Sequence, residues 1–217
     1  MTTDIEIETT AGIAQVALDA PRSARALLLL GHGAGGGVDA RDLRAVRDAA
    51  TAAGHAVARL TQPYRVAGRT SPAPAHVLDA VLVQVVAALR RRRSLARVPL
   101  VVGGRSSGAR VACRSAETVG AQGVLALAFP LHPPGRPDRS RVAELQAVDV
   151  PVLVVQGERD PFGSPEEIRS AGMPARAQLH VVPGADHGMA VRKGDPPAMP
   201  AITAAVLQWL DSGVLVG

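Results

Sequence analysis

Short apolar runs alternate along this chain with segments whose apolar residues recur every three or four positions. Residues 26–30 and 124–129 are continuously apolar, as strands buried on both faces of a parallel sheet are. Two short opening strands are expected at residues 5–8 and 13–18. Further strands are expected at residues 55–60, 98–102, 152–155 and 179–182.

The clearest helix has an apolar face at offsets of three and four, formed by Leu78, Val81, Leu82, Val85, Val86 and Leu89. Another begins near Asp39 and ends at Gly54, and a third is predicted over residues 107–119, closed by Gly120. Ser164, followed by a proline and by a glutamate three positions on, has the pattern of a helix N-cap with a capping box. A last helix carries Ile202, Val206, Trp209 and Leu210.

Strands that alternate with helices predict an α/β fold: a mostly parallel central sheet with helices on both faces. No internal repeat and no long polar linker divides the chain, so a single domain over residues 1–217 is expected. Ligands of such sheets bind beyond the carboxyl ends of the strands. Function is therefore sought in the loops that follow the strands.

Composition narrows the class of protein. No stretch reaches the roughly 18 apolar residues of a membrane span, and the first residues are acidic, so neither a membrane partner nor a secretion signal is expected. The single cysteine, Cys113, allows no intrachain disulfide and suits a reducing compartment, which favours a cytoplasmic location.

The net charge of +5 raises the question of nucleic-acid binding. The one dense basic run, residues 90–93, follows the clearest helix, where cations offset the negative helix C-terminus. Aromatic residues make up only 2% of the chain, so stacking platforms for bases are largely missing. No nucleic-acid partner is expected.

The segment Gly104-Arg105-Ser106-Ser107-Gly108 has the G-x-S-x-G pattern of a nucleophile on a sharp strand-to-helix turn. The five residues alone are as compatible with a chance match in a glycine-rich loop as with a catalytic serine. An apolar strand before and a helix after favour the catalytic interpretation. Ser106 is the predicted nucleophile, because its rival Ser107 lacks glycines at the two flanking positions.

A serine hydroxyl needs a histidine to accept its proton and a carboxylate to orient that histidine. On this turn the expected chain order is serine, acid, histidine. Three histidines follow Ser106: His132 precedes the candidate acid and His180 falls within a predicted strand. His187, in a loop after the strand at residues 179–182, is the predicted base, although a lone loop histidine is ordinarily just solvated.

Asp160, in the loop after the strand at residues 152–155, is the predicted acid. Its alternative interpretation is a turn residue ahead of Pro161. Glu158 in the same loop is a second candidate acid, and Asp186 is poorly placed because it directly precedes His187.

A glycine-rich turn at residues 31–36 follows the strand at residues 26–30. Such a turn can offer backbone N–H groups to an oxyanion, and the amides of Ala34 and Ser107 are the predicted donors. A phosphate-binding loop is the rival interpretation. It is disfavoured because the G-x-G-x-x-G spacing is missing and Lys193 is the only lysine.

Four segments in this order resemble the α/β-hydrolase superfamily across nearly the whole chain: HGAGGG from His32, GGRSSG around Ser106, GERDPFG around Asp160 and GADHG around His187. The chain looks most similar to a small lidless subfamily, related to dienelactone hydrolases, that includes testis-expressed hydrolase-like proteins. Gln62-Pro63-Tyr64 resembles the F-P-Y segment of that subfamily, and residues 131–135 resemble its L-H-P-P-G loop. Gln62 replaces the usual phenylalanine and Ser107 a frequent methionine, so the shape of the pocket is not carried over. Dienelactone hydrolases use a cysteine nucleophile, and Cys113 is instead expected in the core.

The resemblance implies a serine hydrolase that forms an acyl-enzyme on Ser106 and needs no metal or cofactor. Lids of the superfamily usually enter after the strand that ends here at Phe129, where the chain leaves too little length for a large one. An open, shallow site for a small or exposed carboxylic ester or thioester is expected, with four candidate rim residues: His32, Tyr64, Arg65 and His132. Each of these four has the ordinary alternative of a surface loop side chain. The competing hypothesis is a catalytically weak scaffold of the same fold that binds a ligand or a protein partner. Sequence specifies neither the natural substrate nor the oligomeric state.

Overall fold

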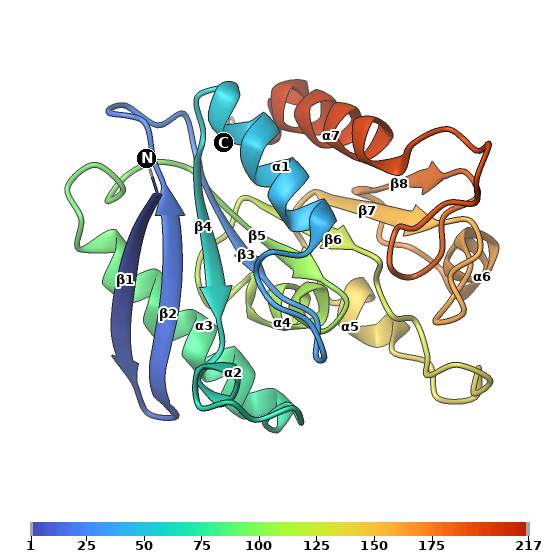
Figure 1. The fold of residues 1–217 in the computed structure, drawn as a ribbon, viewed down its shortest axis with the longest axis horizontal. Helices are drawn as coiled ribbons and strands as arrows, with labels where there is room; N and C mark the ends of the chain where they lie inside the picture. Colours follow the sequence, from blue (N-terminus) through green and yellow to red (C-terminus); the bar gives the residue numbers. More distant parts are fainter. Residues whose placement is uncertain (1, 216–217) are drawn as a thin grey trace.

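The computed structural model describes residues 2–215, and an eight-stranded sheet crosses the whole molecule (Figure 1). Its strand order is β1-β2-β4-β3-β5-β6-β7-β8. The pairs β1–β2 and β2–β4 are antiparallel, and all later pairs are parallel. The strands are β1 (Thr2–Thr9), β2 (Gly12–Asp19), β3 (Leu27–Gly31), β4 (Ala56–Thr61), β5 (Leu100–Arg105), β6 (Gly123–Leu127), β7 (Val152–Gly157) and β8 (Ala177–Val182).

Helices cover both faces of the sheet (Figure 1). They are α1 (Arg41–Ala52), α2 (Pro63–Val66), α3 (Ala75–Arg90), α4 (Ser107–Ser115), α5 (Val142–Gln146), α6 (Pro165–Ala171) and α7 (Ala198–Trp209), with a π-helical turn, η1, at Leu210–Val214. Helices α1 and α7 pack together on one face, and α3 and α4 on the other. The predicted mostly parallel α/β sheet with helices on both faces is confirmed.

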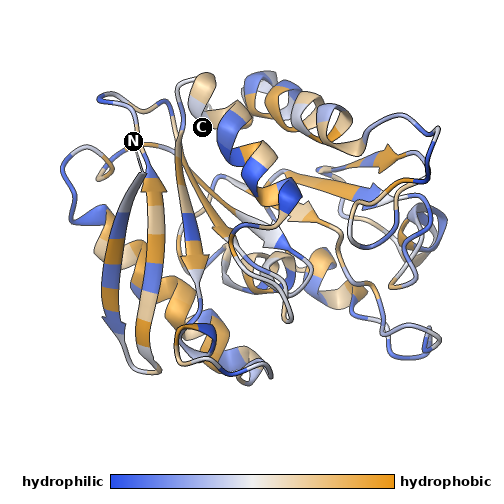
Figure 2. Cartoon of the chain, viewed as in Figure 1, coloured by the Kyte–Doolittle hydropathy of each residue, from blue (hydrophilic) through white to orange (hydrophobic). Residues whose placement is uncertain are grey.

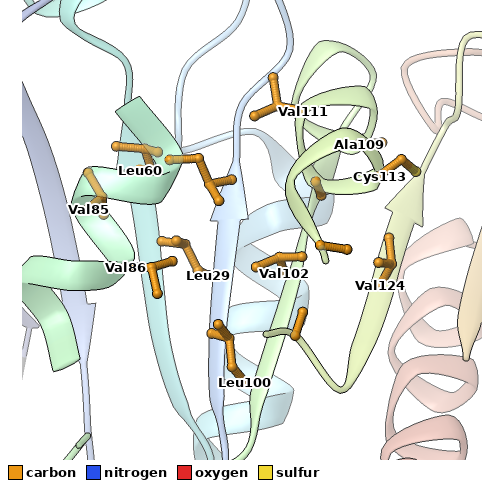
Figure 3. Packing of buried hydrophobic residues seen from close by; sticks show 14 of the residues in the cluster. Leu29, Leu60, Val85, Val86, Leu100, Val102, Ala109, Val111, Cys113 and Val124 are labelled. Atoms are coloured by element: carbon orange, nitrogen blue, oxygen red, sulfur yellow. The ribbon is translucent and has the colours of Figure 1, made fainter. Parts of the chain in front are cut away.

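Alternating side chains of the central strands divide the core into two layers. In β3, Leu27 and Leu29 belong to the layer under α3 and α4, whereas Leu28 and Leu30 belong to the layer under α1 and α7. All four are fully buried, which is why the strand reads as a continuous apolar run. Figure 2 shows these central strands as mainly hydrophobic. Figure 3 shows the α3–α4 layer, where Val86 and Cys113 face strand side chains such as Val102.

The predicted elements differ from the structure mainly at their ends. Strand β5 continues to Arg105, three residues beyond the predicted end, because it pairs with β6 as far as Leu127. Helix α4 stops at Ser115 and the chain continues in turns to Gly120, whose φ is 62°. The short helices α2 and α5 were not predicted, because four or five residues are too few to show an apolar period.

Two local predictions are confirmed by backbone geometry. Ser164 and Glu167 form the capping box at the start of α6, with both reciprocal hydrogen bonds present. Gly54, after α1, has a φ of 87°, the left-handed conformation that glycine adopts most easily. No helix within residues 2–215 is long and apolar enough to cross a membrane.

Candidate active site

Ser106 lies between β5 and α4 in a backbone conformation that residues other than glycine rarely adopt. Its φ is 54° and its ψ is −110°, while its N–H donates to the Leu127 carbonyl at 2.9 Å. Such a conformation costs on the order of 1–3 kcal/mol and persists only where the surroundings enforce it. The turn lifts the Ser106 side chain out of the sheet and leaves it partly exposed.

The flanking glycines are required because β3 passes close to the turn. A Cβ on Gly104 would lie 2.3 Å from the Gly31 carbonyl oxygen, and a Cβ on Gly108 would lie 2.3 Å from the same atom. Gly104 also has a φ of 154°. No other residue type fits either position without moving β3.

The structure brings the side chains of Ser106, His187 and Asp160 into one hydrogen-bonded chain. His187 Nε2 lies 3.0 Å from Ser106 Oγ, and His187 Nδ1 lies 2.8 Å from Asp160 Oδ2. A carboxylate only accepts, so Nδ1 carries the hydrogen and Nε2 is left to accept from the serine hydroxyl. This arrangement lets the histidine take a proton from Ser106.

Asp160 is held by groups that fix both of its oxygens. Its side chain is fully buried. The Phe162 N–H donates to Oδ1 at 2.8 Å, and Gln156 Nε2 donates to Oδ2 at 2.9 Å. The Gln156 amide also donates to the carbonyls of Phe129 and Gly163. Three donors, counting His187, satisfy the oxygens of this buried carboxylate.

The ring of Phe162 stacks on the imidazole of His187. The ring centroids are 4.1 Å apart and the planes are inclined by 28°. The same residue therefore positions the acid through its amide and covers the histidine with its side chain. Stacked rings of this kind restrict how the imidazole can rotate.

The alternative acids make other contacts. Glu158 accepts from the Gly184 N–H at 2.6 Å. Asp186 accepts from the N–H groups of Gly188 and Ala190, at 2.8 and 2.9 Å, and so shapes the loop that carries His187. Neither carboxylate is bonded to the His187 ring. Asp160 is the carboxylate that reaches it.

The glycine-rich turn lies against the nucleophile turn, as its proposed role requires. A Cβ on Gly33 would be 3.6 Å from Ser106 Cβ. Within residues 2–215, the amides of Ala34 and Ser107 donate no hydrogen bond. The prediction that they bind an oxyanion requires such free N–H groups.

His32, at the start of this turn, is held by hydrogen bonds, and it lines the small space that reaches Ser107 and Gly108. Its side chain is buried, the Gln62 N–H donates to Nε2 at 3.2 Å, and Nδ1 lies 2.8 Å from the Gly33 carbonyl oxygen. Nδ1 therefore carries the hydrogen, because Nε2 already accepts one. Burial, the largest cause, lowers the pKa of His32, which keeps the ring neutral in this role. These hydrogen bonds support the turn.

The other three candidate rim residues are placed differently from one another. Tyr64 is largely buried, and its hydroxyl donates to the Ala34 carbonyl at 3.0 Å. Burial raises the pKa of Tyr64, so the hydroxyl keeps its hydrogen. His132 is also buried, between the Pro133 carbonyl at 2.9 Å and Glu167 Oε1 at 3.2 Å. Of the four, Arg65 alone is partly exposed, and it bonds the Arg69 carbonyl.

An apolar cavity of about 250 Å³ lies between α2 and α3. Its wall is formed by Ala11, Gln62, Pro63, Tyr64, Ala67, Arg69, Ala73, Pro74, Val77, Leu78 and Val81. Gln62, Tyr64 and Leu78 also line a much smaller space that reaches Ser107 and Gly108. The cavity and the smaller space thus share three wall residues, and only the smaller space is lined by Ser107.

Cys113 is part of the core under α4 and is not at the site. Burial raises the pKa of its thiol to about 12, so the reactive thiolate does not form near neutral pH. Within the described part of the chain, no group of three or more His, Cys, Asp or Glu side chains gathers in a way that could hold a metal ion.

Sequence reasoning missed four residues that support the site: Asp42, Arg105, Gln156 and Phe162. Gln156 had a readable signal, since a polar residue at the end of an otherwise apolar strand needs a buried partner. Phe162 follows the predicted acid by two positions, but its contact with His187 depends on how two loops meet. Arg105 and Asp42 form an ion pair, Nε to Oδ2, at 3.1 Å between segments far apart in the chain. No local pattern reveals that pair.

Comparisons with known proteins agree with this fold. A serine hydrolase homologue from Coxiella burnetii superposes with a TM-score of 0.79 at 17% identity, over 97% of this chain and 98% of that one. A serine hydrolase without a lid from Xanthomonas campestris gives 0.74 at 21% identity, over 97% and 96%. A dienelactone hydrolase from Anabaena variabilis gives 0.78 at 20% identity, also over 97% and 96%. The sequence model of the family described as "Alpha/beta hydrolase domain" matches residues 24–208, and the chain belongs to that family.

Proposed function

We propose that this protein is a serine hydrolase that cleaves a small or exposed carboxylic ester or thioester through an acyl-enzyme on Ser106. The observation that carries the proposal is the unbroken chain of hydrogen bonds from Asp160 through His187 to Ser106, at 2.8 and 3.0 Å. Its serine stands on a strained turn that the surrounding backbone enforces. Strain of this kind concentrates at functional sites.

In the proposed reaction, Ser106 Oγ attacks the substrate carbonyl carbon while its proton passes to His187 Nε2. The tetrahedral intermediate collapses as the same proton moves to the departing alcohol or thiol, leaving an ester on Ser106. A water molecule then gives a proton to His187 and attacks that ester. The bond between the acyl carbon and Ser106 Oγ breaks as the proton returns from His187 to Oγ, and the acid product leaves. Asp160 stays ionised throughout and stabilises the imidazolium.

The negative charge on the carbonyl oxygen is assigned to the amides of Ala34 and Ser107. Each is without an acceptor in the described chain, and the two segments that carry them touch each other. Preorganised N–H donors of this kind contribute about 10²–10³ in rate for each donor removed. The Tyr64 hydroxyl, bonded to the Ala34 carbonyl at 3.0 Å, would hold the turn in place.

Substrate size is inferred from what surrounds the serine. Between β6 and β7 the chain contains only the one short helix α5 and loops, and Ser106 remains partly exposed. The cavity between α2 and α3, which shares Gln62, Tyr64 and Leu78 with the small space at Ser107, has a volume of about 250 Å³, less than the roughly 300–1,000 Å³ of a typical drug-sized pocket. A short acyl group suits that space, and a bulky alcohol would project into solvent.

A series of p-nitrophenyl and thioester substrates of increasing acyl length tests this proposal. We expect turnover that is best for short acyl groups and is lost in Ser106→Ala, while Ser107→Ala retains a substantial part of it. Full activity of purified Ser106→Ala would refute the assignment. No turnover and no covalent labelling of the folded wild type would instead favour a scaffold that binds without reaction.

A further inference from the structure

Arg105, the residue before Ser106, brings together three segments that meet at the site. Its Nη2 donates to the His187 carbonyl at 2.8 Å. Its Nε lies 3.1 Å from Asp42 Oδ2 in α1. Its Nη1 lies 3.2 Å from where a Cβ on Gly33 would be, against the glycine-rich turn. The guanidinium is mostly buried, with 17% of the side chain exposed.

Asp42 is the anchor of this arrangement. Its side chain is only 2% exposed, and its Oδ1 accepts the Leu43 N–H at 2.9 Å. Burial raises the pKa of Asp42, and the charge of Arg105 opposes that rise. A carboxylate this deeply buried needs a cation beside it, so Asp42 fixes where the guanidinium lies.

The loop around His187 is bonded to the Asp160 loop, where the Arg159 N–H donates to the Ala185 carbonyl at 2.8 Å. The bonds from Asp186 to Gly188 and Ala190 define the shape of the loop from within, without joining it to the nucleophile turn. Arg105 supplies a bond from the nucleophile turn to the main chain of His187 itself. The imidazole is thus held from its backbone as well as from its ring.

We propose that Arg105 is a positioning residue for the reaction: its guanidinium, oriented by Asp42, holds the His187 main chain so that the imidazole meets Ser106 before substrate arrives. The inference rests on the proposed function. A misplacement of about 1 Å between reacting groups can cost on the order of 10²-fold in rate. Arg105 touches no reacting atom, so its loss should reduce kcat and leave KM nearly unchanged.

Arg105→Met tests the proposal, with Arg114→Met as the matched control. Arg114, in α4, is about as buried as Arg105, with 19% of its side chain exposed, and forms a two-bond ion pair with the more exposed Asp79, at 2.8 and 2.7 Å, among residues that do not line the site. We expect Arg105→Met to lower both kcat and the rate of fluorophosphonate labelling by about 10–100-fold, with KM within about threefold. Arg114→Met should leave both rates unchanged for the folded fraction.

Two further variants separate positioning from folding. Arg105→Lys keeps the positive charge, but a lysine ammonium lacks the planar fork of donors with which arginine bonds Asp42 and the His187 carbonyl together. Its kcat should therefore lie between those of the wild type and Arg105→Met. In Arg105→Ala, added guanidinium or ethylguanidinium should restore part of kcat, while ammonium should not. If Arg105→Met does not fold, Asp42→Asn takes its place, since it keeps the shape and the Leu43 bond; its kcat should fall by about tenfold.

The outcomes distinguish this inference from the proposed function. A wild type that neither turns over nor labels defeats the proposed function. A wild type that does both, together with an Arg105→Met whose kcat lies within twofold of it, defeats the positioning role alone. So does a loss of kcat that equals the loss of folded protein.

Discussion

The body of the central sheet is packed with apolar side chains, whereas its carboxyl edge carries buried polar groups. In the body, Leu27 to Leu30 alternate between two apolar layers and make no polar contact with their side chains. At the edge, β3 ends in Gly31, β5 ends in Arg105, and Gln156 is the last residue but one of β7. Here the backbone is strained at Ser106, and buried polar groups are held by specific hydrogen bonds. The difference between the two regions implies that packing within the layers sets the stability of the fold, whereas the proposed reaction takes place at the edge. Changes in one region should therefore leave the other largely intact.

The largest expected effect at the edge is that of Asp160→Asn. An amide cannot accept the His187 Nδ1–H as a carboxylate does, so the ring loses its charge partner and its tautomer. We expect kcat to fall by about 10⁴-fold, with only a small change in stability measured by urea unfolding. Glu158→Gln, in the same loop but bonded to Gly184, serves as the control and should keep its activity. Equal losses in the two variants would mean that the acid has been misassigned.

The largest expected effect in the body is that of Trp209→Ala in α7. Trp209 is fully buried in the α1–α7 layer, beside Ile202 and Val206. Removing it should cost about 3–5 kcal/mol of unfolding free energy, because a cavity of indole size remains. Titration of active sites should show unchanged kcat per folded molecule. A specific fall in kcat would contradict the separation of the two regions. A Trp209→Phe variant as unstable as Trp209→Ala would contradict the cavity as the cause of the lost stability.

Phe162→Leu tests the carboxyl edge with a smaller expected effect on activity. The substitution keeps an apolar side chain but removes the ring that stacks on His187 at 4.1 Å. We expect kcat/KM to fall by about 2–10-fold, the equivalent of an aromatic pair worth about 0.5–1.5 kcal/mol. Phe129→Leu in the core is the matched control: it should cost stability and leave kcat/KM of the folded protein unchanged. The reverse pattern would contradict the role given to Phe162.

The smallest expected effect is a loss of folding stability at acid pH. Burial, in each case the largest cause, lowers the pKa of His32, His55 and His180 below the ordinary value of 6.5. The unfolded chain then binds more protons than the folded one below about pH 6.5, so this share of stability is present above that pH and is lost as the pH falls. His55 is fully buried, and neither of its ring nitrogens has a hydrogen-bond partner among residues 2–215.

Urea unfolding at pH 8 and pH 5.5 measures this dependence. His55→Leu should lose less stability between the two pH values than the wild type does. His76→Leu, at an exposed position in α3, should lose the same amount as the wild type. An unchanged acid loss in His55→Leu would show that other groups account for it.

Sequence predicted the fold well because the buried strands read as apolar runs and the longer helices show a clear period. It also singled out Ser106, Asp160 and His187, which the structure brings within hydrogen-bonding distance. Their catalytic roles, like the organisation of residues 1–217 as one domain, stay predictions. The basis for these predictions was four glycine-containing loops, each of which follows a predicted strand.

The rest of the site depends on contacts between distant segments. His32 was predicted only as a possible rim residue, and nothing in its local sequence indicated that its buried ring would bond the main chain of Gln62 and Gly33. Arg105 and Asp42 lie in different elements, and nothing in either local pattern predicts that they meet. Loop packing, which sets such contacts, leaves no periodic trace in a sequence.

The most direct test of the central claim is peptide mapping by mass spectrometry after the folded protein reacts with a fluorophosphonate. The account predicts one phosphonyl group per chain, attached to Ser106, and none in Ser106→Ala or in protein unfolded beforehand. An adduct on Ser107, or a folded wild type that acquires no adduct at all, would contradict it.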